Sequence, residues 1–268
     1  MCIVLKFGGA SCATPEHFLN IAQIVLKHKK EHPYVVVVIS AMQGVTDELE
    51  VLAKRVAKKP NKRELDMLLS IGERVSMSLL AMCLHDLGFD AVSLTGSQCG
   101  IITSDEHNDA KIIDVKPERI ENYLQQDRIV IVAGFQGVSE NKEITTLGRG
   151  GSDTTAVALG AKLGAKEVIF YKDVPGVFDK DPKCFEDAKR FENMTFDEVL
   201  ELTEKGAKIL QNRCVVLAKK NRLLLKVISF KDHTGTTISS AGIKPKTPQF
   251  EELDFLFATH QTKKSDGY

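Results

Sequence analysis

The residue types most able to do chemistry gather in one glycine-rich stretch, residues 145–155, which reads TTLGRGGSDTT. It directly precedes a predicted helix at residues 153–163. The N-terminus of a helix favours an anion, and Arg149 can bind a carboxylate through two parallel hydrogen bonds. Asp153 would oppose an anion there unless it orients cationic groups. Because a purely structural turn hardly needs Arg, Ser and Asp together, we interpret this stretch as a functional site.

Two further glycine turns follow predicted strands. Lys6-Phe7-Gly8-Gly9 ends the first strand, and residues 40–46 follow a run of valines. Glycines let backbone N–H groups approach phosphate oxygens closely, and a lysine adds a full positive charge. The G-x-x-x-x-G-K-[ST] spacing of a P-loop is absent. Taken alone, the first turn is equally consistent with a tight connection beside a solvated lysine.

The elements that must position these turns alternate along the chain. Apolar runs follow segments of helical period over more than 200 residues, which predicts an α/β fold with a mostly parallel, helix-covered sheet. Pro15 marks one helix start, and Thr195 with Glu198 forms a capping-box pattern at another. The predicted strands are residues 2–7, 34–40, 90–94, 129–134, 167–171 and 223–230. The predicted helices are residues 14–30, 47–58, 62–87, 153–163 and 195–206.

Composition excludes several classes of partner. Lys plus Arg and Asp plus Glu both number 36, so no excess of positive charge favours nucleic acid or an anionic membrane. The longest apolar run, near residues 35–39, is far shorter than a membrane span, and the N-terminus lacks the features of a signal peptide. The six cysteines show no CxxC and no metal-ligand spacing. We therefore expect reduced thiols in a cytoplasmic protein.

A series of short motifs covering roughly residues 2–238 resembles, in type and order, that of the aspartate kinases. The resemblance implies the amino-acid-kinase fold, a three-layer sandwich with a mostly parallel central sheet. It also implies ATP-dependent phosphorylation of the side-chain carboxylate of L-aspartate, the first step towards lysine, methionine and threonine, with Mg²⁺ as the counter-ion of ATP. The motifs are Lys6-Phe7-Gly8-Gly9, residues 40–47, Ser70-Ile71-Gly72-Glu73-Arg74, residues 148–153, Asp173-Val174-Pro175-Gly176-Val177, Asp181-Pro182, Gly206-Ala207-Lys208 and Gly235-Thr236.

The same resemblance implies roles for individual residues. Lys6 and Lys208 would bind the transferring phosphoryl group, and Asp153 would organise the lysines around it. The residues implied to contact ATP are Lys6, Gly8, Gly9, Lys172, Asp173, Phe178, Lys183 and Lys208. The residues implied to contact aspartate are Ser40, Thr46, Glu73, Arg149, Gly150, Gly151 and Ser152. The metal ligands stay unassigned.

The charges of the ligand-facing motifs favour the same substrate class. Glu73 suits an α-ammonium group and Arg149 an α-carboxylate, which favours a free amino acid over UMP, carbamate or an N-acylated acid. The alternative is that Glu73 lies on a solvated helix face near Arg74 and contacts no ligand. A carboxylate acceptor is already ionised at neutral pH, so no general base is needed. This agrees with the seven histidines, none of which lies in a glycine motif; we interpret them as surface or core residues.

Four departures from the family pattern cluster on the side expected to bind the nucleotide. Lys172 stands where the family commonly has Thr, Phe178 where it has Tyr, and Lys183 where it has Arg. Gln211-Asn212 replaces a His-Pro pair. Phe178 keeps a stacking face without the hydroxyl, and Lys183 keeps a charge without bidentate geometry. These changes bear on nucleotide binding and leave the predicted acceptor class untouched.

The chain is expected to hold one catalytic domain, residues 1–238, whose N-terminal part binds the acceptor and whose C-terminal part binds the nucleotide. Residues 239–268 are expected to form a short tail, too short for the paired ACT domains usual in the family. An apolar patch at residues 250–257 is expected to pack back on the domain, with an oligomer contact as the alternative. The fold family makes a homodimer the expected assembly.

Two other functions stay open. The same fold could phosphorylate another amino acid such as glutamate, and the length of the pocket would decide between them. Alternatively, the chain could be a catalytically inactive amino-acid-binding homologue, an interpretation motivated by the departures on the nucleotide side. The intact Lys6, Asp153 and Lys208 argue against that loss of turnover.

Overall fold

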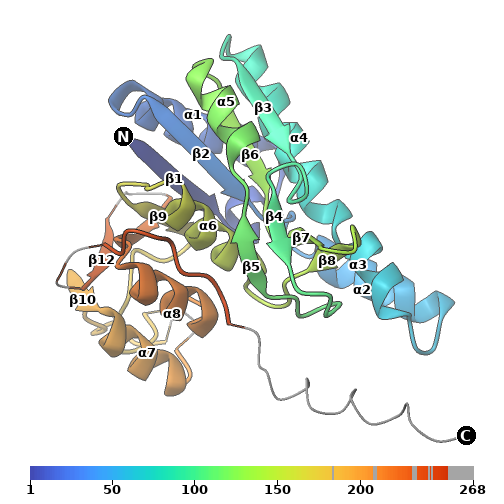
Figure 1. Ribbon diagram of the computed structural model, residues 1–268. Coiled ribbons are helices and arrows are strands. Elements are labelled where there is room, and N and C mark those ends of the chain that lie inside the picture. Colours follow the sequence, from blue (N-terminus) through green and yellow to red (C-terminus); the bar gives the residue numbers. More distant parts are fainter. Residues whose placement is uncertain (183, 208–209, 231–233, 241, 243, 253–268) are drawn as a thin grey trace, which may run out of the picture.

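The computed structural model describes residues 1–182, 184–207, 210–230, 234–240, 242 and 244–252. An eight-stranded sheet runs through the centre in the order β10-β12-β11-β9-β1-β2-β6-β3 (Figure 1). Its neighbours are parallel except for β11 and β12. The strands are β1 (Cys2–Phe7), β2 (Tyr34–Ile39), β3 (Ala91–Leu94), β6 (Ile129–Ala133), β9 (Val168–Lys172), β10 (Asn193–Thr195), β11 (Leu225–Ser229) and β12 (Gly235–Ser239).

Helices cover both faces of this sheet, so the predicted α/β sandwich is confirmed. Successive side chains of a strand point to opposite faces, and β1 accordingly contributes Ile3 and Leu5 to one core and Val4 to the other. On the first face lie α1 (Pro15–Glu31) and α4 (Ile71–Asp86). On the second lie α5 (Glu118–Gln125), α6 (Gly151–Lys162), α7 (Phe196–Glu204) and α8 (Asn212–Asn221). All six residues of β1 are buried, Lys6 included, which explains why the other five are apolar.

The predicted helix at residues 62–87 is two helices in the structure, α3 (Lys62–Leu69) and α4. The break falls at Ser70, whose carbonyl accepts a hydrogen bond from Gln136 Nε2 at 2.9 Å. Ser70 is fully buried, and this bond comes from a residue 66 positions away. A tertiary contact therefore accounts for an interruption that helix propensity does not predict.

The stretch Lys62–Asp86, which contains α3 and α4, is long and apolar enough to cross a membrane by its length and composition alone. Within its most apolar window, 50% is buried inside the protein. Met77, Leu80, Ala81 and Leu84 of α4 belong to the core between this helix and the sheet.

A second, smaller sheet was not predicted. It has the order β5-β4-β7-β8 and lies beside the carboxyl ends of the central strands (Figure 1). Its strands are β4 (Ile101–Thr103), β5 (Ile112–Val115), β7 (Gln136–Ser139) and β8 (Ile144–Thr146). Each holds only three or four residues, too few for a periodic pattern to stand out in the sequence.

Of the apolar patch expected to pack back on the domain, the structure describes Phe250 alone. Phe250 packs against the core on the α6 and α8 face. Glu251 accepts a hydrogen bond from the Ile112 N–H at 2.7 Å and pairs with Arg213 of α8. Leu253, Phe255, Leu256 and Phe257 lie outside the described residues.

Candidate active site

A cavity of about 600 Å³ opens at the carboxyl ends of β1, β2 and β9, beside the N-terminus of α6. Ligands of open α/β sheets bind at this edge, because loops from several strands converge there. The cavity brings together most of the residues predicted for the site, from five separate parts of the chain. These are Lys6, Gly9, Ser40, Thr46, Glu73, Arg149, Gly150, Gly151, Ser152, Asp153 and Lys172.

The other predicted residues lie elsewhere. Gly8 precedes the short 3₁₀ helix η1 (Gly9–Cys12), and a Cβ there would lie 3.4 Å from Lys6 Nζ. Asp173 is exposed after β9, and Phe178 is half-buried in an isolated bridge to Arg190. Neither lines the cavity. Lys183 and Lys208 lie outside the described residues.

A buried carboxylate between two lysines forms the centre of the cavity. Asp153, in the first turn of α6, contacts Lys6 Nζ through Oδ1 at 2.5 Å and Lys172 Nζ through Oδ2 at 3.3 Å. Burial alone would raise the pKa of this carboxyl, but the charges of Lys172 and Lys6 and their hydrogen bonds lower it to about 2. The carboxylate therefore stays ionised and holds two cations side by side. The departure at Lys172 thus places an additional cation next to Lys6.

Glu73 presents an acceptor to the same cavity from the first turn of α4. Its Oε1 accepts a hydrogen bond from the Ala41 N–H at 3.1 Å, and the residue is only 3% exposed. Its Oε2 is buried and has no hydrogen-bond partner among the described residues. Burial raises the pKa of this carboxyl to about 7, against the lowering effects of the backbone hydrogen bond and the Lys6 charge. A cationic group in the cavity would satisfy the second oxygen and favour the ionised form.

The glycines around Arg149 shape the opposite wall. Gly150 caps α6 in the left-handed conformation, with φ of 74°, and a Cβ there would come within 1.7 Å of Gln211 Cγ. The structure therefore places one family departure, Gln211, directly against the glycine turn and in the lining of the cavity. Arg149 is exposed, and no hydrogen bond or ion pair holds its side chain within the described part of the chain. Its guanidinium is available for a ligand.

Several lining residues were not predicted. The apolar ones, Leu65, Leu69, Phe135 and Leu210, come from parts of the chain without a chemical motif. Asn108 belongs to the connection between β4 and β5, and Thr146 ends β8. Thr146 belongs to the glycine-rich stretch at residues 145–155, but nothing in the local pattern assigned it to the wall of the cavity.

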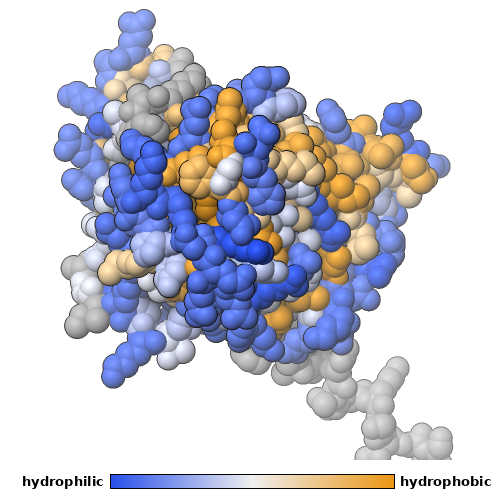
Figure 2. Space-filling view, turned by 90° about the horizontal axis from the view of Figure 1, so that it is seen from above, coloured by the Kyte–Doolittle hydropathy of each residue, from blue (hydrophilic) through white to orange (hydrophobic). Residues whose placement is uncertain are grey.

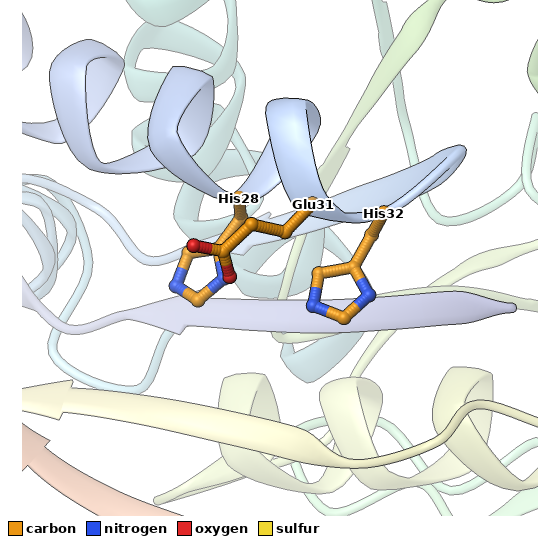
Figure 3. Close-up of side chains that lie close together, drawn as sticks. All are labelled: His28, Glu31 and His32. Atoms are coloured by element: carbon orange, nitrogen blue, oxygen red, sulfur yellow. The ribbon is translucent and has the colours of Figure 1, made fainter.

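None of the five histidines in the described residues lines the cavity. Two of them, His28 and His32, come together with Glu31 at the C-terminal end of α1 (Figure 3). The ligand-type atoms of these three side chains lie within 4.8 Å of one another. His28 Nε2 also lies 2.7 Å from the Tyr171 hydroxyl, and burial lowers the pKa of its imidazole. The His28 side chain therefore packs against Tyr171 of β9, where burial favours the neutral imidazole.

Two lysines around one carboxylate give this edge of the α/β sandwich a local positive charge, which complements an anionic group. Residues 1–229 match the Amino acid kinase family, and the chain belongs to this family.

Among its relatives, the chain is 48% identical over 238 residues to the aspartokinase of Mycobacterium tuberculosis strain H37Rv, a match covering 88% of this chain and 56% of that protein. The crystal structure of aspartate kinase from Synechocystis aligns with a TM-score of 0.83 at 40% identity, over 94% of this chain and 42% of the other. E. coli aspartokinase III, solved with aspartate and ADP, aligns with a TM-score of 0.80 at 26% identity, over 91% and 66%. The chain thus spans little more than half the length of the Mycobacterium relative.

Proposed function

We propose that this chain is the catalytic part of an aspartate kinase, which transfers the γ-phosphoryl group of ATP to the side-chain carboxylate of L-aspartate. The observation that carries the proposal is the cavity itself. It holds Glu73 with an unsatisfied oxygen, the available guanidinium of Arg149 and the Lys6–Asp153–Lys172 cluster. These groups complement an ammonium, a carboxylate and a phosphoryl group. The similarity to aspartokinases supports the same acceptor.

In this proposal the acceptor is held at both ends of its backbone. Glu73 binds the α-ammonium group and Arg149 the α-carboxylate. The hydroxyls of Thr46, Ser40 and Ser152 then surround the side chain, and Gly150 and Gly151 let it approach the start of α6. The acceptor carboxylate is already a nucleophile at neutral pH, so positioning and charge neutralisation supply most of the catalysis.

The phosphoryl group lies beside the lysines. Lys6 and Lys172 neutralise the charge that develops on the transferring oxygens, and Asp153 holds both ammonium groups in place. Lys208 is proposed as a further cation. The oxygen of the acceptor forms a bond to the γ-phosphorus as the bond to ADP breaks, and the products are 4-aspartyl phosphate and ADP.

Nucleotide binding is assigned to the C-terminal part of the domain and to the first glycine turn. Gly8 and Gly9 approach the phosphates, and Asp173, Phe178 and Lys183 face the ribose and adenine side. Mg²⁺ accompanies the nucleotide, and Asp153 is engaged by two lysines and therefore not assigned to it. The ATP phosphates would hold the ion, and no protein ligand is assigned.

Hydroxylamine traps an acyl phosphate as a coloured hydroxamate, so it tests the reaction directly. The protein is incubated with ATP, Mg²⁺ and hydroxylamine, together with L-aspartate, L-glutamate or N-acetylglutamate. Colour with aspartate alone is the expected result. Colour with glutamate instead would make glutamate the acceptor. A folded protein that forms no product with any of the three would refute the kinase proposal.

Aspartate binding is expected to release a proton from Glu73. In the free protein this carboxyl is mostly protonated at about pH 6, because its pKa is raised to about 7. The α-ammonium group of the ligand favours the ionised form, so about one proton should leave per aspartate bound. Calorimetric titration at about pH 6 in two buffers of different ionisation enthalpy measures this number. Equal heats in both buffers would contradict the assignment, and Glu73→Gln should remove the buffer dependence.

The same raised pKa affects the stability of the ligand-free protein. Between the ordinary value of 4.5 and about 7 the folded state binds more protons at Glu73 than the unfolded chain does. The contribution of Glu73 to stability therefore falls as the pH rises through this window, by about 3 kcal/mol in total. Bound aspartate should offset this loss.

The proposed assembly is a homodimer in the cytoplasm. The amphipathic α2 (Val45–Val56) has no buried residue, and Val56 is 84% and Met82 65% exposed. Figure 2 shows apolar side chains gathered on the side of the molecule that α2, α3 and α4 form. A helix with an uncovered apolar stripe normally packs against a partner, and a second copy provides a matching surface.

Light scattering on a sizing column should give twice the chain mass of 29.6 kDa. Replacing Val75 and Met82 of α4 together by glutamate should yield a monomer, because the charges would be buried in the interface. The matched control is Val216→Glu on α8, also partly exposed, which should leave the dimer intact. A monomeric wild-type protein would contradict the assembly.

A further inference from the structure

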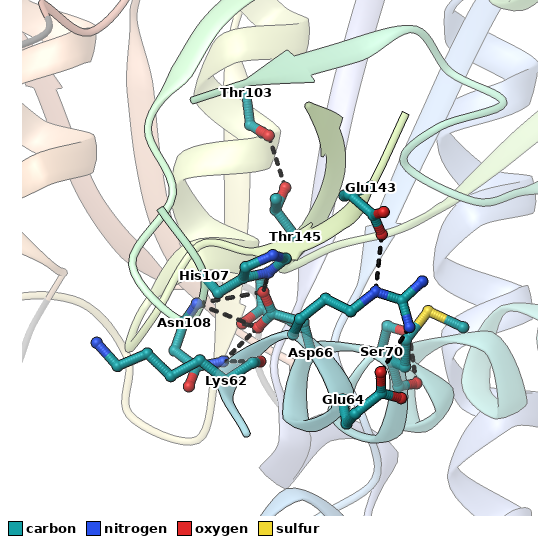
Figure 4. A network of polar contacts seen from close by, with 12 residues as sticks. Lys62, Glu64, Asp66, Ser70, Thr103, His107, Asn108, Glu143 and Thr145 are labelled. Carbon is teal, nitrogen blue, oxygen red and sulfur yellow. Dashed lines mark hydrogen bonds and ion pairs between the residues drawn. The ribbon is translucent and has the colours of Figure 1, made fainter. Parts of the chain in front are cut away.

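A second buried carboxylate, separate from the lysine cluster, lies directly behind the cavity wall. Asp66 of α3 is 0% exposed and does not line the cavity itself. Figure 4 shows the donors that surround it. His107 Nδ1 lies 2.6 Å from Oδ2, and the Asn108 N–H donates to both oxygens at 3.2 Å. Asn108 Nδ2 donates to Oδ1 at 2.5 Å, and the Thr146 hydroxyl donates to the same oxygen.

These bonds join three parts of the chain that are far apart in sequence. Asp66 belongs to a helix, His107 and Asn108 to the connection between β4 and β5, and Thr146 to the end of β8. Burying a carboxylate is costly unless its lone pairs are satisfied, and here both oxygens accept more than one hydrogen bond. The carboxylate therefore acts as a single hub that fixes the relative positions of all three segments.

The hub holds Asn108 in a conformation that few side chains adopt. Its φ is 69°, in the left-handed region, which asparagine tolerates better than most residues. Its backbone N–H and its side-chain amide both donate to Asp66, and the amide also donates to the Lys62 carbonyl at 3.2 Å. An unfavourable backbone conformation persists where the surroundings over-determine it, and such positions cluster at binding sites.

Asn108 and Thr146 connect this hub to the proposed acceptor site. Both line the cavity, and the Ala110 N–H donates to the Thr146 carbonyl at 3.0 Å. Gly148, with φ of 71°, packs so closely on this connection that a Cβ there would lie 3.0 Å from the Asn108 carbonyl oxygen. Arg149 is the next residue. The turn that carries the arginine therefore rests on the segment that Asp66 holds.

We infer that Asp66 is a positioning residue for the amino-acid acceptor. Its carboxylate fixes the position of the cavity wall that Asn108 and Thr146 form. Through Gly148, which packs on this wall, it also fixes the backbone position from which the Arg149 side chain extends. The inference rests on the proposed function, because it takes the ligand of this cavity to be a free amino acid. The nucleotide side of the site does not depend on this hub.

Asp66→Asn keeps the size of the side chain but turns an NH₂ group towards donors. The expected result is an increase of roughly ten-fold in the dissociation constant for L-aspartate, measured by calorimetry without nucleotide, since at least one hydrogen bond to a charged group is lost. The KM for aspartate should rise by a similar factor, and the KM for ATP should stay within about two-fold. A lowered Tm with unchanged aspartate affinity would reduce Asp66 to a merely structural role and overturn the inference.

A second pair of variants tests the hub without touching Asp66. Asn108→Ala removes the amide but keeps a Cβ at the positive φ, whereas Asn108→Gly removes the whole side chain and keeps the left-handed conformation accessible. The alanine variant should bind aspartate more weakly than the glycine variant. Equal affinities would show that the conformation of this wall does not matter for binding.

The matched control is Glu143→Gln. Glu143 pairs with Arg63 of α3 at 2.9 Å, so the change removes an exposed ion pair on the same helix without altering the hub. Aspartate affinity should stay at the wild-type value. If the wild-type protein binds aspartate but forms no hydroxamate, the kinase proposal fails and the binding measurements still decide the role of Asp66. If it does not bind aspartate, both fail.

Discussion

Replacing Lys6 by methionine is expected to lower kcat by about two to three orders of magnitude, the usual effect of removing one preorganised group from a developing charge. Lys6 is buried and contacts Asp153 at 2.5 Å, so its ammonium cannot be replaced by water or by a mobile side chain. The aspartate dissociation constant should change far less, because the proposed partner of Lys6 is the phosphoryl group. Steady-state rates and calorimetry on the same preparation measure both quantities.

A matched control distinguishes the loss of a lysine charge in the cavity from the loss of a lysine charge elsewhere on the protein. Lys205→Met removes an exposed i, i+4 ion pair with Glu201 on α7 and should leave kcat unchanged. Asp153 also bears on the interpretation, because without Lys6 it still pairs with Lys172. If Lys6→Met kept wild-type turnover in folded protein, the lysine cluster would not be the phosphoryl site.

Arg149→Ala is expected to raise the KM for aspartate by about ten- to a hundred-fold, with a smaller change in kcat. A charge-assisted bidentate contact to a carboxylate contributes roughly 1.5–3 kcal/mol, which gives this range. The side chain is exposed and has no partner in the described part of the chain, so its removal should cost little stability. Thermal unfolding of the variant checks that the loss is one of binding.

Two further variants test whether the effect comes from the carboxylate contact of Arg149. Arg149→Lys keeps the charge and loses the fork geometry, so it should recover only part of the affinity. Arg119→Ala on α5 removes an exposed arginine away from the cavity and should behave as wild type. An unchanged KM for aspartate in Arg149→Ala would remove the carboxylate role and would weaken the choice of a free amino acid as acceptor.

Six of the eight strands of the central sheet could be predicted because their signals are local, whereas β10, β12, α5 and α8 were not predicted. The apolar residues of β1 and β2 reflect burial on both faces of the sheet. The capping box of Thr195 and Glu198 at the start of α7 is present as predicted. The helix start marked by Pro15 is also present as predicted, and Thr14 holds the N-cap position of α1 without a capping hydrogen bond from its side chain.

The glycine turns were recognisable because glycine, arginine and hydroxyl side chains combine there for a chemical reason. Lys6, Glu73, Arg149 and Asp153 were all selected from the sequence, and the structure places all four around one cavity. Their roles remain predictions until the variants are measured. Lys172 was assigned from its motif to the nucleotide, and its contact with Asp153 shows that it also belongs to the centre of the cavity.

By itself, the sequence determined six strands of the central sheet, several of its covering helices, the glycine turns and the residue types available for chemistry. Only the tertiary structure decided the small sheet, the break at Ser70, the place of Gln211 against Gly150 and the hub at Asp66. The physical reason is the range of the interactions. Periodicity and capping act within a few residues, whereas Asp66 and Thr146 stand 80 positions apart and meet only when the sheet edge is assembled.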